Sequence, residues 1–437
     1  MKTMPYIPIK YKFIFTLIVA TLWMMLSIWL SQPWLSDLSH HIGAPAAYFL
    51  IGFIAIIPGF MNAFLMTALL LDKRPKIKPI EQYPGITLLV AAYNEETSIA
   101  ETVQSLAAQQ YPGPLQIVVI NDGSKDATAD KVRALLPTIP ELTLIDVQPN
   151  GGKANALNQG LKIAEHPYIV TVDGDCLLWT DALKNIVGRM LSDPPNTKAV
   201  AGSILIRNSR QNWITQAQEW DYFLGIAAIK RVQSLFQGTL VAQGAFSVYD
   251  KDVLLDIGGW PETVGEDIVL TWKILQAGHR VGHAENAVAF TRCPDTFIQF
   301  ARQRQRWSRG LIEAFKATPG ILFKRRMPVF YIWWNTLFPF IDLAYTIGFI
   351  PGLVLAMFGI YWIVGPMTLA LLPMAFLMNL LMHNRSKATF KELNLTVRRN
   401  RLGLIVYSLV YSLLLQPACV WGYVSEFLNL RKTWGTK

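Results

Sequence analysis

The sequence of 437 residues contains little cysteine and little charge. Its three cysteines, Cys176, Cys293 and Cys419, are too few and too scattered for a disulfide framework or a zinc site. Charged residues make up only 16% of the chain, and some long stretches have none. The shortage of cysteine fits a globular part that folds in a reducing compartment.

Charge is absent from two apolar runs near the N-terminus, residues 13–30 and 46–71. Each run is long enough to cross, as a helix, a hydrocarbon core about 30 Å thick. Three further apolar runs fill residues 329–358, 361–382 and 402–425. These runs predict two membrane helices, a soluble domain and a second membrane bundle.

The first apolar run could also be a cleaved signal peptide, because basic residues precede it at Lys2, Lys10 and Lys12. No small-residue cleavage site follows the run, and the bulky Trp29 and Trp34 occupy that region instead. We therefore predict an uncleaved membrane anchor.

The net charge of +10 comes largely from basic residues beside the apolar runs. The loop 31–45 has no lysine or arginine, whereas a basic cluster follows the second run. That cluster is Lys73, Arg74, Lys76 and Lys78, and a second basic loop contains Arg385, Lys387, Lys391, Arg398, Arg399 and Arg401. The positive-inside rule then places the central domain in the cytosol. We therefore expect the chain to interact with a lipid bilayer and not with a nucleic acid.

From Ile86 onward, short apolar strands alternate with helical stretches. The pattern predicts strands at 86–91, 116–120, 142–146 and 168–172, and helices at 97–109, 127–136, 154–165 and 180–191. Such alternation is typical of right-handed βαβ units and a parallel sheet with helices on both faces. Ligands of open sheets of this kind bind at the carboxyl ends of the strands.

Polar residues follow the first two predicted strands, at 93–96 and 121–126. Helix caps and turns explain both segments without any function. However, Asp122 lies directly at a strand end, where a carboxylate can accept hydrogen bonds from a base or a ribose. Each motif alone leaves both interpretations open.

The third and fourth strand ends suggest phosphate and metal chemistry. Lys153 follows Gly151-Gly152 at a helix N-terminus, where its charge opposes the helix dipole unless an anion such as a diphosphate lies there. Asp173 and Asp175 lie one residue apart, so they repel each other and need a cation or donors nearby. An Asp-Gly-Asp turn is common by itself. Four neighbouring strand ends that offer base, phosphate and metal chemistry together are harder to explain as turns.

By these residues, segment 85–316 resembles the GT-A fold, inverting glycosyltransferases of the family that includes cellulose, chitin, hyaluronan and poly-N-acetylglucosamine synthases. The resemblance implies that Asp173 contacts the nucleotide of a UDP-sugar and that Asp175 holds a divalent metal, Mg²⁺ or Mn²⁺, on the diphosphate. It also implies that four residues line the uridine and diphosphate pocket: Tyr93, Glu95, Asp122 and Lys153.

Two further motifs extend the resemblance. Gly265-Glu266-Asp267 resembles the family's Thr-Glu-Asp motif, although Gly replaces Thr. The motif implies that Asp267 is the catalytic base, with Glu266 beside it. Gln303, Arg306 and Trp307 match the Gln-x-x-Arg-Trp motif of processive members, in which the Arg neighbours the diphosphate and the Trp supports the acceptor sugar.

An amphipathic helix on the membrane surface would explain residues 297–315 equally well, and both interpretations can hold together. The segments 243–246 and 259–260 fall where the family has its acceptor-lining loops. These two matches are weaker than the others.

The resemblance implies an α/β GT-A (Rossmann-like) cytosolic domain between N-terminal and C-terminal transmembrane helices. The expected divisions are two membrane helices in 1–74, the catalytic domain in 75–295, interfacial helices in 296–327, a membrane bundle in 328–428 and a tail in 429–437. The tail's 434–437 resembles a cytosolic gating segment, yet three full spans would place it outside. Either one segment is re-entrant or interfacial, or this match is accidental.

The layout most resembles bacterial poly-β-1,6-N-acetylglucosamine synthases of the biofilm matrix. That resemblance implies UDP-N-acetylglucosamine as donor, a growing exopolysaccharide as acceptor, a small membrane partner subunit, and export across the inner membrane. Hyaluronan-, chitin- and cellulose-like synthases share these motifs. A non-processive transferase to polyprenyl phosphate is an alternative enzyme, and a transporter subunit with a nucleotide-sensing domain is an alternative of another class.

Overall fold

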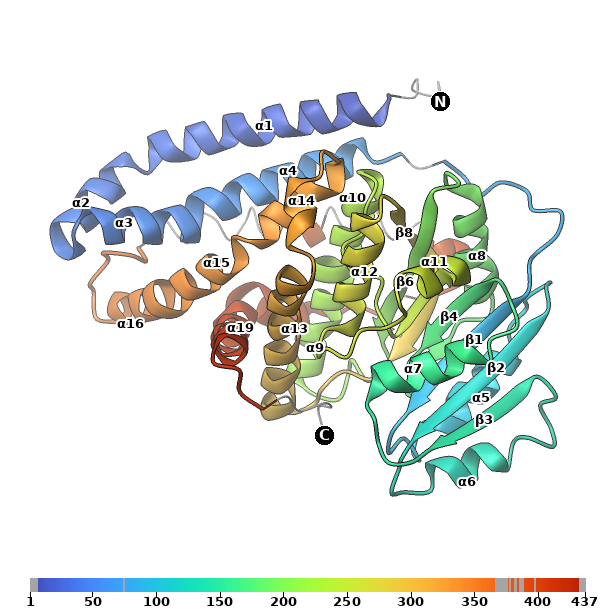
Figure 1. The fold of residues 1–437 in the computed structure, drawn as a ribbon. Coiled ribbons are helices and arrows are strands. Elements are labelled where there is room, and N and C mark those ends of the chain that lie inside the picture. The colour runs from blue at the N-terminus through green and yellow to red at the C-terminus, as the bar shows by residue number, and fades with distance from the viewer. Residues whose placement is uncertain are drawn as a thin grey trace.

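The computed structural model describes residues 7–73, 75–365, 376, 379, 380, 383, 384, 389–396 and 398–431. Much of the predicted run 361–382, the basic residues Arg74, Arg385 and Lys387, and the predicted gating segment 434–437 lie outside these residues. The described chain forms an α/β domain beside a group of long apolar helices, and α1 and α4 run along one side of the molecule (Figure 1).

In the part of the chain that the structure describes, eight strands form one sheet in the order β3-β2-β1-β4-β7-β6-β8-β5. The strands are β1 Ile86–Ala92, β2 Leu115–Asp122, β3 Leu142–Val147, β4 Tyr168–Val172, β5 Leu177–Leu178, β6 Thr197–Ile206, β7 Phe246–Asp250 and β8 Arg280–Thr291. The four strands predicted from the sequence, β1 to β4, are present and mutually parallel. The second half, which we did not predict, contains antiparallel pairs of β7 with β4 and β6.

The helices of the α/β domain cover both faces of this sheet (Figure 1). They are α5 Ile99–Ala107, α6 Thr128–Arg133, α7 Lys153–Lys162, α8 Ala182–Ser192, α9 Trp213–Trp220, the π-helix η2 Asp221–Ala228, α10 Ile229–Leu235, α11 Lys251–Asp256 and α12 Glu266–Gln276. Leu89 packs with Leu157 of α7, whereas its neighbours Leu88 and Val90 pack with Val103 of α5. Both faces of β1 are therefore buried, which explains why its sequence is continuously apolar.

The remaining helices flank the domain at its two ends in sequence. They are α1 Ile9–Leu30, α2 Gln32–Ile42, α3 Ala44–Ile51, η1 Gly52–Ile56, α4 Ile57–Leu71, α13 Phe297–Ala317, η3 Pro319–Phe323, α14 Met327–Asn335, α15 Phe338–Ala344, η4 Tyr345–Phe349, α16 Ile350–Met357, α18 Arg401–Val406, η5 Tyr407–Tyr411 and α19 Ser412–Phe427. Of these, η1, η4 and η5 are π-helices and η3 is a 3₁₀-helix.

Within the described residues, four helical segments are long and apolar enough to cross a membrane: Ile9–Leu30, Ala44–Leu71, Met327–Met357 and Arg401–Phe427. They coincide with four of the five predicted apolar runs. Aromatic rings join the first three to the α/β domain, because Phe13 and Phe64 lie 5.2 Å and 5.8 Å from Phe236, and Phe330 lies 5.4 Å from Phe13. The membrane helices and the domain thus pack as one unit.

The segment Arg401–Phe427 is held at its two ends: its start contacts the α/β domain, and its end contacts α13. Before its start, the Trp220 indole N–H donates to the Asn400 carbonyl oxygen at 2.8 Å. At its end, the Arg309 guanidinium of α13 donates to Glu426 at 2.8 Å and to the Arg431 carbonyl oxygen at 3.3 Å. In Figure 1, α19 is seen almost along its axis, whereas α1 and α4 lie across the view.

Candidate active site

The loop after β1 is joined to the loop after β2 by hydrogen bonds. The backbone N–H of Asn94 donates to the Ser124 hydroxyl at 3.0 Å, and that of Glu95 to the Thr128 hydroxyl at 2.8 Å. Asn94 has a φ of +55°, a left-handed conformation that asparagine tolerates better than most residues. Tyr93 stays 39% exposed at this edge of the sheet.

Asp122 holds the loop that follows β3. Its two oxygens each accept a backbone N–H, from Gly151 and Gly152, both at 2.8 Å, and the Asn150 side chain adds a third bond at 3.0 Å. The carboxylate is buried and most of its acceptor capacity is used inside the protein. Its predicted contact with the nucleotide stays a prediction, whereas its support of the loop is observed.

Lys153, the first residue of α7, joins two loops that are far apart in sequence. Its ammonium lies 2.5 Å from an Asp173 oxygen and 3.3 Å from a Glu266 oxygen. Burial by itself would lower the pKa of Lys153, but the charges of Asp173 and Glu266 raise it well above its ordinary value. These carboxylates supply the anionic partners that we expected from a diphosphate, so Lys153 links the strand ends to the N-terminus of α12.

Asp173 and Asp175 lie beside each other after β4, and Glu95 lies close to them. The potential ligand atoms of Asp173, Asp175 and Cys176 are all within 4.8 Å of one another. Burial, together with the charges of Asp173 and Glu95, raises the pKa of Asp175 to about 6. The Thr291 hydroxyl lies 3.3 Å from both oxygens of Asp175.

This group of residues fits Mg²⁺ or Mn²⁺. Two carboxylates offer the hard oxygen ligands that Mg²⁺ prefers, and a cation would relieve the repulsion between them. Burial keeps the pKa of the Cys176 thiol well above its usual range, so the thiol stays neutral and is a poor ligand. A carboxylate-bound metal therefore suits this site better than a thiolate-bound one.

Glu266 and Asp267 begin α12, where the positive end of the helix dipole favours negative charge. Glu266 is buried, and burial raises its pKa to about 7 against the opposing charge of Lys153. Asp267 is half-buried, with Oδ2 3.4 Å from the Gly244 backbone N and Oδ1 2.8 Å from that of Ile268. The structure thus brings the Gly244 loop and Asp267 together.

Gly265, the departure from the Thr-Glu-Asp motif, has a packing cause. A Cβ atom at Gly265 would lie 2.5 Å from the Cα of Gly310 in α13, which is closer than carbon atoms approach. The Gly265 N–H also donates to Glu313 of α13 at 2.9 Å. Two glycines therefore let the backbones of α12 and α13 touch. Across this contact, the positive charge of Arg306 lowers the pKa of Glu266 and opposes the effect of burial.

The Gln-x-x-Arg-Trp motif lies in the middle of α13, and its residues face different ways. Gln303 is buried, and its Oε1 has no hydrogen-bond partner in the part of the chain that the structure describes. Arg306 is half-buried, and Trp307 is 39% exposed. The side chain of Trp260, by contrast, is buried in the core 5.8 Å from the Tyr249 ring and is not available to an acceptor.

Lys230 and Arg304 are two buried charges that sequence reasoning missed. Burial lowers the pKa of Lys230 to about 7, and the charge of Asp267 opposes this shift. Arg304 pairs with Asp221 at 2.9 Å. The only sequence signal for Lys230 is its place next to an apolar stretch, and Arg304 is an unassigned position within the motif.

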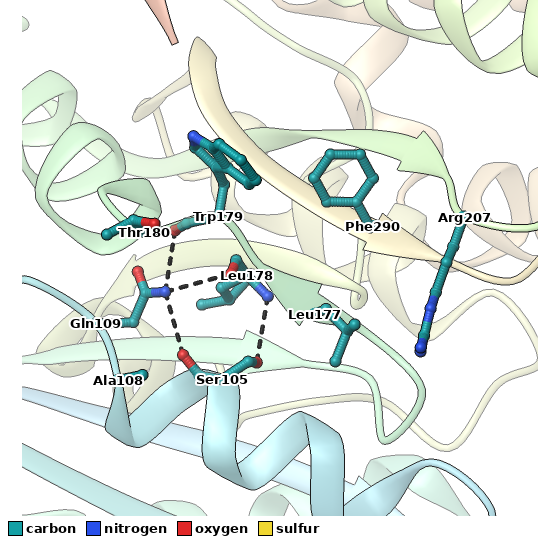
Figure 2. A pocket seen from close by; sticks show the side chains of 9 residues that line it. All are labelled: Ser105, Ala108, Gln109, Leu177, Leu178, Trp179, Thr180, Arg207 and Phe290. Carbon is teal, nitrogen blue, oxygen red and sulfur yellow. Dashed lines mark hydrogen bonds between the residues drawn. The ribbon is translucent and has the colours of Figure 1, made fainter. Parts of the chain in front are cut away.

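A cavity of about 380 Å³ lies beside β5, which follows the Asp173–Cys176 turn directly. Figure 2 shows Trp179, Phe290 and Arg207 around it. Its polar groups already have partners, since Gln109 donates to the Trp179 carbonyl oxygen at 2.9 Å and Arg207 pairs with Glu101 at 2.7 Å. None of the predicted site residues lines this cavity.

Comparison with known sequences identifies the central domain. Residues 87–258 match the family described as glycosyl transferase family 2. The poly-β-1,6-N-acetyl-D-glucosamine synthase of Staphylococcus aureus (strain COL) is 34% identical over 241 residues, which cover 55% of this chain and 57% of that protein. The synthase of the same name from Staphylococcus epidermidis is 30% identical over 272 residues, 60% of this chain and 65% of that protein. These alignments span less than two thirds of each relative.

Comparison with solved structures confirms the predicted GT-A fold. The mannosyltransferase PcManGT from Pyrobaculum calidifontis, solved in complex with GDP-Man and Mn²⁺, superposes with a TM-score of 0.58. It is 22% identical in sequence, and the match covers 88% of this chain and 99% of that one. Fold, family match and relatives agree: residues 87–258 match glycosyl transferase family 2 on a GT-A fold, and the chain is similar to the poly-β-1,6-N-acetyl-D-glucosamine synthases.

Proposed function

We propose that the chain is a membrane-bound, inverting glycosyltransferase that extends a β-linked exopolysaccharide processively from UDP-N-acetylglucosamine. One observation carries the proposal: Lys153 contacts both Asp173 and Glu266, so the strand-end loops and the Glu266-Asp267 pair form a single site. The similarity to poly-β-1,6-N-acetyl-D-glucosamine synthases supports the choice of donor and product.

The loops after β1 to β4 would bind the donor. Tyr93, Glu95 and Asp122 lie along this edge of the sheet, where ligands of open α/β sheets bind. Asp173 and Asp175 would hold Mg²⁺ or Mn²⁺, which when bound offsets the negative charge of the diphosphate. Lys153 provides a fixed positive charge beside the same carboxylates.

Asp267 would act as the general base. Its exposed part can accept the proton of an acceptor hydroxyl, and the hydroxyl oxygen then forms a bond to the anomeric carbon on the face opposite UDP. The bond from the anomeric carbon to UDP breaks, UDP leaves with the electron pair, and an α-linked donor yields a β-linked product. Arg306 stabilises the leaving diphosphate, and Trp307 supports the acceptor ring.

The helix arrangement supports a cytosolic C-terminus. Arg401–Phe427 contacts the α/β domain at its start and α13 at its end, so we propose that it lies along the membrane surface and does not cross. The end of the described chain at Arg431 then lies on the catalytic side. The other apolar helices would anchor the enzyme in the bacterial inner membrane. The same proposal includes export of the polymer across this membrane and a small membrane partner subunit.

The test is donor-dependent UDP release by the purified full chain in detergent with Mn²⁺. UDP-N-acetylglucosamine, UDP-glucose and UDP-glucuronic acid are compared, with Asp267→Asn as the inactive control. We expect release with the first donor together with a high-molecular-weight product. Release with another donor would replace the proposed sugar, and single-sugar transfer to polyprenyl phosphate would replace polymer synthesis. Release that survives Asp267→Asn would refute the assigned base.

A further inference from the structure

Arg304 lies inside the Gln-x-x-Arg-Trp motif, yet the proposed reaction gives it no role. Its side chain is 4% exposed, and its guanidinium carbon lies 4.1 Å from the centre of the Trp307 ring. One of its nitrogens lies 2.9 Å from an Asp221 oxygen. The guanidinium is therefore held between a carboxylate and the indole on which an acceptor sugar would rest.

Tyr411 completes the surroundings of this charge. Its hydroxyl donates to the same Asp221 oxygen at 2.8 Å. Its ring lies 5.4 Å from that of Phe300, and the Arg304 guanidinium lies 5.1 Å from the Phe300 ring and 5.7 Å from the Tyr411 ring. Three segments far apart in the sequence therefore meet at one guanidinium.

Asp221 and Tyr411 both belong to π-helical turns. Asp221 is the first residue of η2, and Tyr411 is the last residue of η5. A π-turn shifts the side chains that follow it around the helix, and such turns are frequent at functional sites. Here the side chains of Asp221 and Tyr411, one from each π-turn, both face Arg304 of α13.

These contacts position the side chain of Trp307. Phe300, Arg304 and Trp307 are spaced by four and three residues, so they share one face of α13. The Tyr222 ring lies 6.2 Å from the Trp307 ring, and 39% of Trp307 remains open to solvent. The indole thus has a buried cation over its ring and is still accessible to solvent.

We propose that Arg304 is a positioning residue, which Asp221 and Tyr411 hold in place so that the Trp307 indole keeps one orientation toward the acceptor sugar. The proposal rests on the proposed function of Trp307 as acceptor platform. A buried ion pair adds little net stability, because desolvation offsets its attraction. A planar guanidinium that is fixed at one end, however, can orient the ring against which it stacks, and a lysine ammonium cannot do this.

The direct test measures hydroxyl-radical oxidation of Trp307 by mass spectrometry in the full chain. Arg304→Lys keeps the charge but removes the planar guanidinium that covers the Trp307 ring, and Asp221→Asn removes the charge that pairs with the guanidinium. We expect both variants to increase Trp307 oxidation about twofold, because the ring loses its cover. Arg302→Lys is the matched control, since Arg302 is exposed on the same helix. Unchanged oxidation in both variants would overturn the proposal.

A second readout separates positioning from folding. With UDP-N-acetylglucosamine as donor, Arg304→Lys should shorten the product about fivefold while the initial rate of UDP release falls less than about twofold. If the rate of UDP release falls while the product length stays unchanged, Arg304 is only structural. If the wild-type chain releases no UDP from any donor, the proposed function fails, and the oxidation of Trp307 still decides whether Arg304 orients the ring.

Discussion

The two sides of the proposed active site are built by different means. The donor side consists of the loops after β1 to β4, and hydrogen bonds from backbone N–H groups to side-chain oxygens join these loops to each other, as the Asp122 carboxylate joins Gly151 and Gly152. The acceptor side consists of α12, α13, η2 and the segment 401–427, and close helix contacts hold it together. Gly265 touches Gly310 in this way.

Substitutions on the two sides of the site should therefore have different effects. A donor-side change outside the side chains that hold the loops, such as Asp122, removes a group that would touch the ligand and leaves the loop frame in place. A change at the contact between Gly265 and Gly310 pushes α12 and α13 apart, because no side-chain atoms separate their backbones there. Donor-side substitutions should therefore alter ligand binding, and acceptor-side substitutions should alter turnover or product length.

The largest expected effect is that of Asp267→Asn. An amide cannot accept the acceptor proton, so turnover should fall about 100- to 10,000-fold. Initial UDP release with UDP-N-acetylglucosamine measures it. Glu262→Gln, an exposed carboxylate shortly before α12, serves as the control and should keep the wild-type rate. A wild-type rate for Asp267→Asn would assign the base to another residue.

Asp175→Asn should have the next largest effect. Losing one carboxylate weakens the metal site, so turnover should fall about 100-fold and require more Mn²⁺. A titration of rate against Mn²⁺ concentration tests this prediction, with the exposed Asp252→Asn as control. An unchanged Mn²⁺ dependence would show that Asp175 does not hold the metal.

Gly265→Thr, which restores the residue of the family motif, should be harmful in this chain. The added side chain would collide with Gly310, so we expect a loss of about 1–3 kcal/mol in the free energy of unfolding and a lower rate. Thermal unfolding and UDP release measure the two effects. Gly320→Ala is the control, because the nearest atom to its new Cβ is the end of a flexible glutamine. Wild-type stability and rate would mean that the helices can separate freely.

The smallest expected effect concerns pH. The folded protein raises the pKa of Glu266 from 4.5 to about 7, so the folded chain binds this proton more tightly than the unfolded chain does. The contribution of Glu266 to stability is therefore present below about pH 4.5 and is lost as the pH rises to about 7. Lys153, Asp267 and Arg306 face this group, and their charges enter the net shift.

Glu266→Gln should remove this dependence. We expect the unfolding temperature of the wild-type chain to fall by a few degrees more between pH 5 and about pH 7 than that of the variant. Lys230, whose pKa is lowered to about 7, acts above pH 7 and in the opposite direction, so Lys230→Met provides a control. Equal slopes for wild type and Glu266→Gln below pH 7 would contradict the assignment.

Much of the donor side could be predicted from the sequence. The strands β1 to β4 are short apolar runs with polar residues directly after them, and parallel strands bring such residues to one edge of a sheet. Asp173 and Asp175 stand out because adjacent carboxylates need a cation. These signals are local, so a single sequence carries them.

On the acceptor side, the family resemblance pointed to Asp267, Arg306 and Trp307, but the packing around them could not be predicted from the sequence. Arg304 is buried, and Asp221 and Tyr411 reach it from other segments of the chain. Lys230 is buried by tertiary packing, and no pattern around it indicates that Asp267 lies near. The sequence showed Gly265 as a departure from a motif, but only Gly310 explains it.

The most direct test of a site with separable donor and acceptor sides is calorimetric binding of UDP in the presence of Mn²⁺. The wild-type chain, Asp267→Asn and Asp175→Asn are compared under the same conditions. We predict that Asp267→Asn binds UDP within about twofold of wild type although its turnover is lost, whereas Asp175→Asn binds UDP at least about tenfold more weakly. Loss of UDP binding in Asp267→Asn, or unchanged binding in Asp175→Asn, would contradict the division of the site.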